Sequence, residues 1–341
     1  MRNYFEKIDT KEYKGIDIFS KDSQFDKQKD IMSICLFKST IDSPFITIAI
    51  PTYNRTSTLK DAIDSALYQN EPNCIYDIVV VDDCPKRQDN TELFMEQYRG
   101  TIVSYYKNQK NLNQAGNWNK MYSLARGKYV VMLHDDDMLH CKYLQIVSSI
   151  LSLNDSIDFL YFDNVFFSEK PPITPSTIKT NLTPIKIALS DMFTHDPVHI
   201  AGNVLKRESV IELGGFQKDM EPNHDHAFWA KITYFKNSYY VPVPLAYYRI
   251  GINCSTCPEL MNKMEHALTH VSVSILKKLN IPRVITNIIQ LSVNKNQVLA
   301  TRKLFINDYE SNYFEPITTL EYHLSTKLAF WVKKLLKFKG K

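Results

Sequence analysis

Apolar segments that alternate with helical patterns constrain this chain most strongly. The run FITIAIP at residues 45–51 is almost entirely apolar, which is typical of a strand covered on both faces. LKDAIDSALYQ (59–69) then has apolar residues at helical spacing. YDIVVVDD (76–83), TIVSYYKN (101–108) and KYVVMLHDDD (128–137) repeat the strand pattern, with helical patterns between them. This alternation predicts right-handed crossovers and an α/β fold with a mainly parallel central sheet flanked by helices.

Three of these strands end in polar motifs, namely PTYNR (51–55), VDD (81–83) and HDDD (134–137). Ligands of such sheets bind beyond the carboxyl ends of the strands, so we expect the three motifs to form one site. The three consecutive aspartates 135–137 repel one another, and carboxylate oxygens are the ligands that Mg²⁺ and Mn²⁺ prefer. Because such an ion keeps positions for substrate phosphates, the motif predicts a nucleotide diphosphate. The alternative is that these acids are solvated loop charges or a helix N-terminal cap.

Charge and composition exclude several other classes. The 41 basic and 37 acidic residues leave a net charge of +4, which does not indicate a general nucleic-acid binder. Neither a secretory signal nor an apolar stretch of about 18 residues is found, so we expect a cytoplasmic protein. The segment PTYNRTSTLK has no glycine, which argues against the glycine-rich phosphate loops of nucleotidyltransferases and dinucleotide enzymes.

The order of the motifs resembles the family 2 glycosyltransferases with a GT-A fold. PTYNR, VVVDD, NxxxxGNWNKMYSLARGKYVVMLHDDD and GGF follow one another, and an acidic residue then precedes an aromatic helix. The resemblance covers residues 45–250. It implies a Rossmann-like GT-A sheet and an inverting, hexosyltransferase-like enzyme with Mn²⁺ or Mg²⁺ as cofactor. The implied donor is a nucleotide-diphosphate sugar, with UDP favoured, and the acceptor is a hydroxyl of a growing glycan in bacterial cell-surface polysaccharide or lipopolysaccharide synthesis.

The resemblance places the donor at the strand ends. Tyr53 offers a ring for stacking on the base, and Asp82 and Asp83 match the acids that bind the base or ribose. Arg249 matches an arginine near the phosphates, although Gly251 stands where the family often has histidine; alternatively, Arg249 pairs with a surface acid. The expected nucleotide-sugar residues are Pro51, Thr52, Tyr53, Arg55, Asp82, Asp83, Asn113, Asn117, Asp135, Asp136 and Arg249.

The metal ligands depend on how HDDD is aligned with the usual family pattern of Asp, any residue, Asp, Asp. Aligning the apolar flanks puts His134 where the first aspartate often stands, and it leaves Asp136 and Asp137 in the matching acidic places. We expect Asp136 to be the first metal ligand and Asp137 the second. Asp135 and Asp137 also form a DxD by themselves, so the ligand pair stays open.

The catalytic base is expected in the segment NHDHAFWAK, where the family usually has a Glu-Asp pair before a helix. His224 takes the glutamate place, and Asp225 takes the aspartate place. Asp225 is therefore the candidate base that accepts the proton of the acceptor hydroxyl; its alternative role is a helix cap. His224 and His226 could share the proton transfer or flank the acceptor. Trp229 could line the acceptor surface, or it could belong to the core.

The chain divides into an N-terminal extension (1–44), a catalytic domain (45–255) and a helical C-terminal region (256–341). The segment YYVPVPLAYYRI (239–250) predicts an edge strand, because prolines are poorly tolerated inside a sheet. Residues 323–341 carry six lysines and no acid, and a helix there would separate leucines from lysines.

That separation is typical of a helix lying on an anionic membrane, and the alternative is a helix packed in a bundle. On the inner face of the cell membrane, such a peripheral enzyme would meet a lipid-linked glycan acceptor. A catalytically inactive sugar-nucleotide or glycan-binding protein with the same fold is the alternative function.

Overall fold

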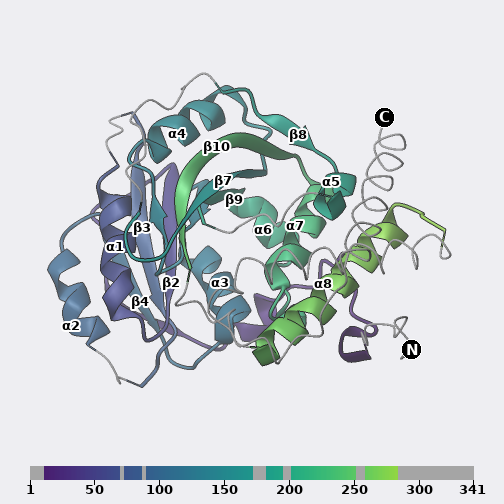
Figure 1. Ribbon diagram of the computed structural model, residues 1–341. Helices are drawn as coiled ribbons and strands as arrows, with labels where there is room; N and C mark the ends of the chain where they lie inside the picture. Colours follow the sequence, from purple (N-terminus) through teal and green to yellow (C-terminus); the bar gives the residue numbers. More distant parts are fainter. Residues whose placement is uncertain are drawn as a thin grey trace.

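The computed structural model describes residues 11–69, 73–86, 90–171, 182–194, 201–250 and 258–282. Within these ranges, one ten-stranded sheet has the strand order β1-β4-β3-β2-β5-β9-β7-β10-β6, and β8 pairs with β10. Helices lie on both sides of this sheet, so that α1 and α3 face opposite sides of the strands β2 to β4 (Figure 1). The arrangement confirms the predicted α/β fold.

The strands are β1 Ser33–Phe37, β2 Ile46–Thr52, β3 Tyr76–Asp82, β4 Val103–Asn108, β5 Tyr129–Met132, β6 Met138–Leu139, β7 Phe159–Phe167, β8 Ile185–Ile187, β9 Asn203–Lys206 and β10 Ser238–Arg249. The α-helices are α1 Thr56–Leu67, α2 Thr91–Met95, α3 Asn113–Leu124, α4 Tyr143–Leu153, α5 Leu189–Thr194, α6 Arg207–Glu212, α7 His224–Phe235 and α8 Pro258–Lys278. Short 3-10 helices span Lys11–Tyr13, Asp26–Gln28, Glu96–Tyr98 and Lys218–Met220.

The centre of the sheet is parallel. Strands β4, β3, β2 and β5 run in the same direction, with Ile48 paired to both Ile78 and Val131. Strand β9 then runs antiparallel between β5 and β7, and β7 continues with a parallel partner, β10. The parallel strands bring the ends of β2, β3 and β5 to one edge, where the three polar motifs meet as predicted.

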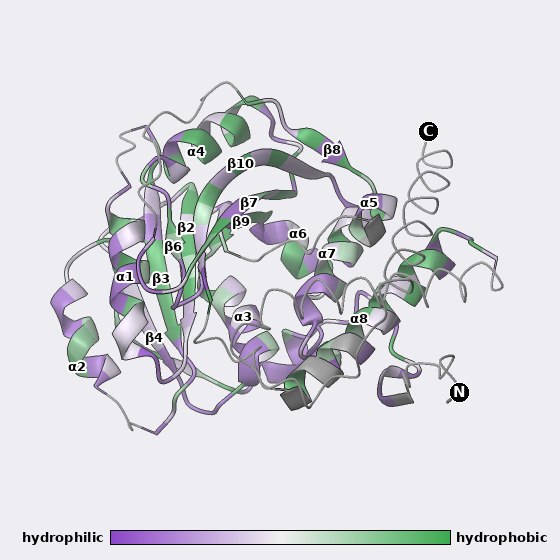
Figure 2. Ribbon diagram, viewed as in Figure 1, coloured by the Kyte–Doolittle hydropathy of each residue, from purple (hydrophilic) through white to green (hydrophobic). Residues whose placement is uncertain are grey.

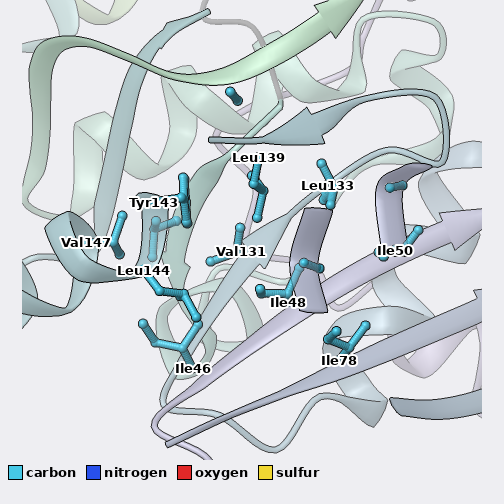
Figure 3. Close-up of a cluster of buried hydrophobic side chains, with 14 of the residues drawn as sticks. Ile46, Ile48, Ile50, Ile78, Val131, Leu133, Leu139, Tyr143, Leu144 and Val147 are labelled. Carbon is cyan, nitrogen blue, oxygen red and sulfur yellow. The ribbon is translucent and has the colours of Figure 1, made fainter. Parts of the chain in front are cut away.

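Two hydrophobic clusters cover the two faces of the sheet. Alternate residues of β2, such as Ile46, Ile48 and Ile50, point to the face covered by α1 and α4. Figure 3 shows these three side chains beside Val131 and Leu133. Ala49 points to the opposite face, where α3 and α7 pack. Because both faces are buried, the central strands β2, β3 and β5 are mainly apolar, and green predominates along the central strands in Figure 2.

Strand β10 is not an edge strand, in contrast to the expectation from its two prolines. It lies between β7 and β6, and its first residues also pair with β8. The register with β7 shifts between Val241 and Pro244 and again between Pro244 and Ala246. β8 pairs only before the prolines and β6 only after them, so neither proline has to donate a ladder hydrogen bond to these two strands.

The described part of the N-terminal extension packs on the rest of the chain. β1 pairs antiparallel with β4, and Tyr13, Ile18 and Phe19 pack in a third cluster with α7 and α8. Tyr13 also donates a hydrogen bond to the backbone oxygen of Glu221. No helix among the described residues is long and apolar enough to cross a membrane. The expected membrane-binding segment 323–341 lies outside the described residues.

Candidate functional site

The end of β2 supplies the groups that contact the acidic loop after β5. Thr52 Oγ1 donates a hydrogen bond of 2.8 Å to Asp135 Oδ2. The guanidinium of Arg55, three residues further along, pairs with Asp136 and lies 3.4 Å from Asp135 Oδ1. Two of the three consecutive aspartates therefore share one arginine, whose positive charge partly offsets the repulsion between them.

Asp137 is held by the end of β10. The backbone N–H of Arg249 donates to Asp137 Oδ1 at 2.9 Å, and Arg249 Nε donates to the backbone oxygen of Asp136 at 2.8 Å. Arg249 also forms an ion pair of 2.8 Å with Asp61, a half-exposed residue of α1. Arg249 thus pairs with an acid near the surface, as the alternative interpretation expected, and its backbone and side chain both fix the acidic loop.

The protein partners of the acidic loop stabilise its carboxylates only in part. Burial, together with the charge of Asp136, raises the pKa of Asp135 to about 7. The same two causes raise the pKa of Asp137 well above its ordinary value. Asp137 Oδ2 is buried and accepts no hydrogen bond. Burial lowers the pKa of His134, so its imidazole is neutral near pH 7, the form that binds metals.

His134, Asp136 and Asp137 can present ligand atoms that all lie within 4.8 Å of one another. The distance from His134 Nδ1 to Asp137 Oδ2 is 3.7 Å. Carboxylate oxygens, one of them buried without a hydrogen bond, are suitable ligands for a hard divalent cation. The residues at this end of β5 therefore fit the divalent ion that the sequence predicted.

The acids at the end of β3 are satisfied by the protein itself. Asp82 accepts hydrogen bonds from the backbone N–H of Cys84 and from the hydroxyl of Tyr105. Asp83 accepts from Asn108 Nδ2 at 2.8 Å and from the N–H of Leu112. Burial raises the pKa of Asp83 to about 6. Both carboxylates hold the loops around them, and their oxygens can each accept a further hydrogen bond.

The remaining donor-side residues differ in how accessible they are. Tyr53 is 49% exposed beside the acidic loop, so its ring can meet a ligand, whereas Pro51 is buried inside β2. Asn117 is buried and donates to the backbone oxygen of Val81. Asn113 starts α3 with a φ of 60° and is exposed. Tyr53 and Asn113 are therefore the two that present themselves to solvent.

Asp225 and His226 form a pair in the first turn of α7. Asp225 Oδ1 lies 3.0 Å from His226 Nδ1 and accepts the backbone N–H of His226 at 2.7 Å. Burial alone would raise the pKa of Asp225, but the neighbouring His226 and His224 lower it well below its usual range. Burial lowers the pKa of His226, and the charge of Asp225 more than reverses this. Asp225 is thus held as a carboxylate, and it also binds a backbone N–H of the first turn.

Trp118 connects this turn with the acidic loop. Its ring centroid lies 5.3 Å from that of His134 and 4.4 Å from that of His224. Burial lowers the pKa of His224 to about 4, and both of its ring nitrogens lack a hydrogen-bond partner. The two histidines that depart from the family pattern therefore lie on one tryptophan, a relation that nothing in the sequence indicated.

Trp229 belongs to the core. It is 1% exposed and stacks on Phe159 with a centroid distance of 4.8 Å and an interplanar angle of 13°. Its indole therefore presents no accessible face to an acceptor. The alternative interpretation of Trp229 as a core residue agrees with this position, while His224 and His226 lie at the start of the same helix.

The GGF motif positions the loop before α7. Gly215 has a φ of +77°, and a Cβ there would lie 2.4 Å from Asn119 Oδ1. This approach lets Asn119 bond both the N–H and the carbonyl of Phe216. Phe216 in turn packs on Trp118 and His224. Asn119, which the sequence did not single out, thus helps to fix the turn that carries Asp225.

Comparison with solved structures agrees with this fold. Among solved structures, TarS of S. aureus in complex with UDP-GlcNAc has a TM-score of 0.55 at 16% identity and covers 86% of each chain. The mannosyltransferase PcManGT of Pyrobaculum calidifontis, in complex with GDP-Man and Mn²⁺, has a TM-score of 0.50 at 14% identity and covers 92% of this chain and 89% of its own. The fold is therefore that of a GT-A glycosyltransferase.

Residues 47–211 match the family model described as glycosyl transferase family 2. An uncharacterized glycosyltransferase of Haemophilus influenzae is 22% identical over 311 residues, which cover 85% of this chain and 99% of the relative. One of Methanocaldococcus jannaschii is 23% identical over 196 residues, which cover 56% of this chain and 65% of the relative. Residues 47–211 are thus identified as a glycosyl transferase family 2 domain.

Proposed function

We propose that the protein is an inverting, metal-dependent glycosyltransferase that transfers a sugar from a nucleotide-diphosphate sugar to an acceptor hydroxyl. One observation carries this proposal. Thr52, Arg55 and Asp135–137 meet at the carboxyl edge of the sheet, and Trp118 links them to the turn that holds Asp225. Trp118 therefore contacts both His134, next to the proposed donor edge, and His224, next to the candidate base.

On the donor side, Asp136 and Asp137 would hold Mn²⁺ or Mg²⁺, and such an ion stabilises the negative charge that develops on the departing diphosphate. We propose that the ring of Tyr53 stacks on the base, and its exposure supports this role. Asp82 and Asp83 shape the adjoining loop and offer oxygens to the base or ribose. UDP is our proposed carrier, which the UDP-GlcNAc complex of the similarly folded TarS supports.

On the acceptor side, Asp225 would take the hydroxyl proton as the new bond to the anomeric carbon forms. The carboxylate is a weak base before reaction because its pKa is low, so the transfer must occur late, when the hydroxyl has become acidic. His226 orients the carboxylate through its Nδ1 contact. Deprotonation of His226 would make Asp225 more basic, because a positive neighbour would be lost.

The acceptor and cellular setting extend this proposal. We propose a glycan or lipid-linked glycan acceptor in bacterial cell-surface polysaccharide or lipopolysaccharide assembly, in keeping with the family resemblance. The lysine-rich pattern of residues 323–341 supports a cytoplasmic enzyme that lies peripherally on the inner face of the membrane.

Calorimetric titration of the full chain with UDP, GDP and dTDP, with and without Mn²⁺, tests the donor side. We expect metal-dependent binding of one nucleotide, and its loss in Asp136→Ala. The matched control is Asp219→Ala, which removes an exposed acid of the 3-10 helix Lys218–Met220. If none of the nucleotides binds in the presence of metal, the proposed donor site is wrong.

Turnover separates an enzyme from an inactive binding protein of the same fold. We expect slow release of free sugar from the matching nucleotide sugar without acceptor, and transfer when lipid-linked acceptors are supplied. Asp225→Asn should leave nucleotide binding near the wild-type value and reduce transfer by about 10²- to 10⁴-fold, because only the base is removed. Tight nucleotide binding without hydrolysis or transfer would support the inactive binding protein instead.

A further inference from the structure

His134 stands where the family pattern of Asp, any residue, Asp, Asp has its first aspartate, and its position in the structure gives it a specific neighbour. Its Nδ1 lies 3.7 Å from Asp137 Oδ2, the buried oxygen that accepts no hydrogen bond. Its Nε2 is also buried without a hydrogen-bond partner. His134 Nδ1 and Asp137 Oδ2 therefore lie too far apart for a direct hydrogen bond, and neither Asp137 Oδ2 nor His134 Nε2 has a hydrogen-bond partner in the described structure.

The spacing of these atoms fits two ligands of one cation. Ligand atoms about 2.1 Å from a metal lie about 3 Å apart at a right angle and about 4 Å apart when opposite. The separation of 3.7 Å falls between these limits. Asp136 offers a further oxygen, and the ligand atoms of the three residues lie within 4.8 Å of one another, so a small side-chain movement would bring all three to one ion. Arg55 contacts Asp136 through Oδ2, and a carboxylate can use its two oxygens for two different partners.

The fold fixes the imidazole in this place. The backbone N–H of Asp137 donates to the carbonyl of His134 at 3.2 Å, which closes a tight turn between the two residues. The ring of His134 packs on Trp118, which is itself 2% exposed. Arg249 holds the other oxygen of Asp137 through its backbone N–H. Both side chains thus have little freedom, which favours binding by a preformed pair.

We propose that His134 is the third protein ligand of the divalent cation, together with Asp136 and Asp137, and that this nitrogen selects Mn²⁺ or Co²⁺ over Mg²⁺. The inference rests on the proposed function and specifies its metal. Imidazole suits the transition metals, whereas Mg²⁺ prefers oxygen ligands and gives up its waters reluctantly. A site with three oxygen ligands would lack this discrimination.

Pulsed electron paramagnetic resonance of Mn²⁺ bound to the full chain, in the presence of UDP, tests the ligand directly. We expect a nitrogen coupling in the echo-envelope modulation of the wild-type protein that disappears in His134→Asn. The matched control, His266→Asn, removes a half-buried histidine of α8 and should keep the coupling. A wild-type spectrum without nitrogen coupling, or a coupling that survives in His134→Asn, would overturn the proposal.

Metal selectivity gives a second measurement with a variant that keeps an anionic ligand. Calorimetry should show that wild-type protein binds Mn²⁺ at least about tenfold more tightly than Mg²⁺, and that His134→Asp reduces this ratio. An unchanged ratio would contradict the assignment even if His134→Asn failed to fold. Nitrogen coupling without nucleotide-dependent turnover would leave the metal site intact and remove the proposed function. Turnover by a protein whose Mn²⁺ shows no nitrogen coupling would leave the proposed function intact and overturn the assignment of His134 as a ligand.

Discussion

The acidic ends of β3 and β5 contain the same residue type at the same edge of the sheet, but they are satisfied in different ways. Asp82 and Asp83 accept hydrogen bonds from Tyr105, Asn108 and backbone N–H groups. The loop after β5 has one arginine for Asp135 and Asp136, and Asp137 keeps an oxygen without a hydrogen bond. The first pair holds the loops around it, whereas the second group keeps a buried carboxylate oxygen without a hydrogen bond and fits a divalent cation.

Replacement of Asp136 should have the largest effect on function. We expect Asp136→Ala to lower the rate of sugar transfer by about 10²- to 10³-fold, because one ligand of the cation that stabilises the diphosphate is lost. The free energy of unfolding should stay near the wild-type value, since the change removes one of three like charges and Arg55 keeps Asp135. Steady-state transfer assays and denaturant titrations measure the two quantities. A large loss of stability in Asp136→Ala would contradict the proposal that the end of β5 serves function while the end of β3 stabilises the fold.

Replacement of Asp83 should reverse that pattern. Asp83→Ala leaves the N–H of Leu112 and the amide of Asn108 without this acceptor, so the free energy of unfolding should fall by about 1–3 kcal/mol. Transfer by the folded fraction should fall less than in Asp136→Ala. Urea titration, with Asp219→Ala as the control for loss of an exposed acid, measures the change. An Asp83→Ala protein of normal stability that no longer binds nucleotide would show that Asp83 acts mainly on the ligand.

The pH dependence of stability separates the two ends without any ligand. Burial raises the pKa of Asp83 to about 6 and that of Asp135 to about 7, above the unfolded value of about 3.9. The folded protein therefore binds more protons, and each group makes stability fall as pH rises from about 4 to its folded pKa, by up to about 1.4 kcal/mol per pH unit. Between pH 6 and 7 the contribution of Asp83 is nearly complete, whereas Asp135 still titrates, alongside His226, whose pKa is also raised. Denaturant titrations should show that Asp135→Asn reduces the loss of stability in this interval and that Asp83→Asn does not.

Cation binding should give the smallest shift. Because a ligand of the folded state stabilises it by mass action, excess Mn²⁺ at pH 8 should raise Tm by a few degrees. Scanning calorimetry should show that this shift is absent in Asp136→Ala and retained in Asp83→Ala. Equal shifts in both variants would place the cation elsewhere.

The sequence predicted the fold well, because strands covered on both faces and amphipathic helices leave periodic patterns that can be read locally. The strand of residues 76–82 and the helix that starts near Asp225 are examples, and both are present. The position of β10 was predicted incorrectly, because its prolines suggested an edge. The sheet tolerates these prolines because β8 pairs with β10 only before them and β6 only after them. No local sequence pattern indicates where those partner strands pair.

For the site, the sequence by itself determined which chemical groups the strand ends carry and that parallel strands would bring them to one edge. Only the tertiary structure decided their partners. Arg55 and Asp136 are 81 residues apart, and the side chains of His134 and His224 meet Trp118 from different elements. Such contacts depend on strand register and helix packing rather than on neighbours in the chain. The residue types were therefore set locally, and the balance of charge around them was set by the fold.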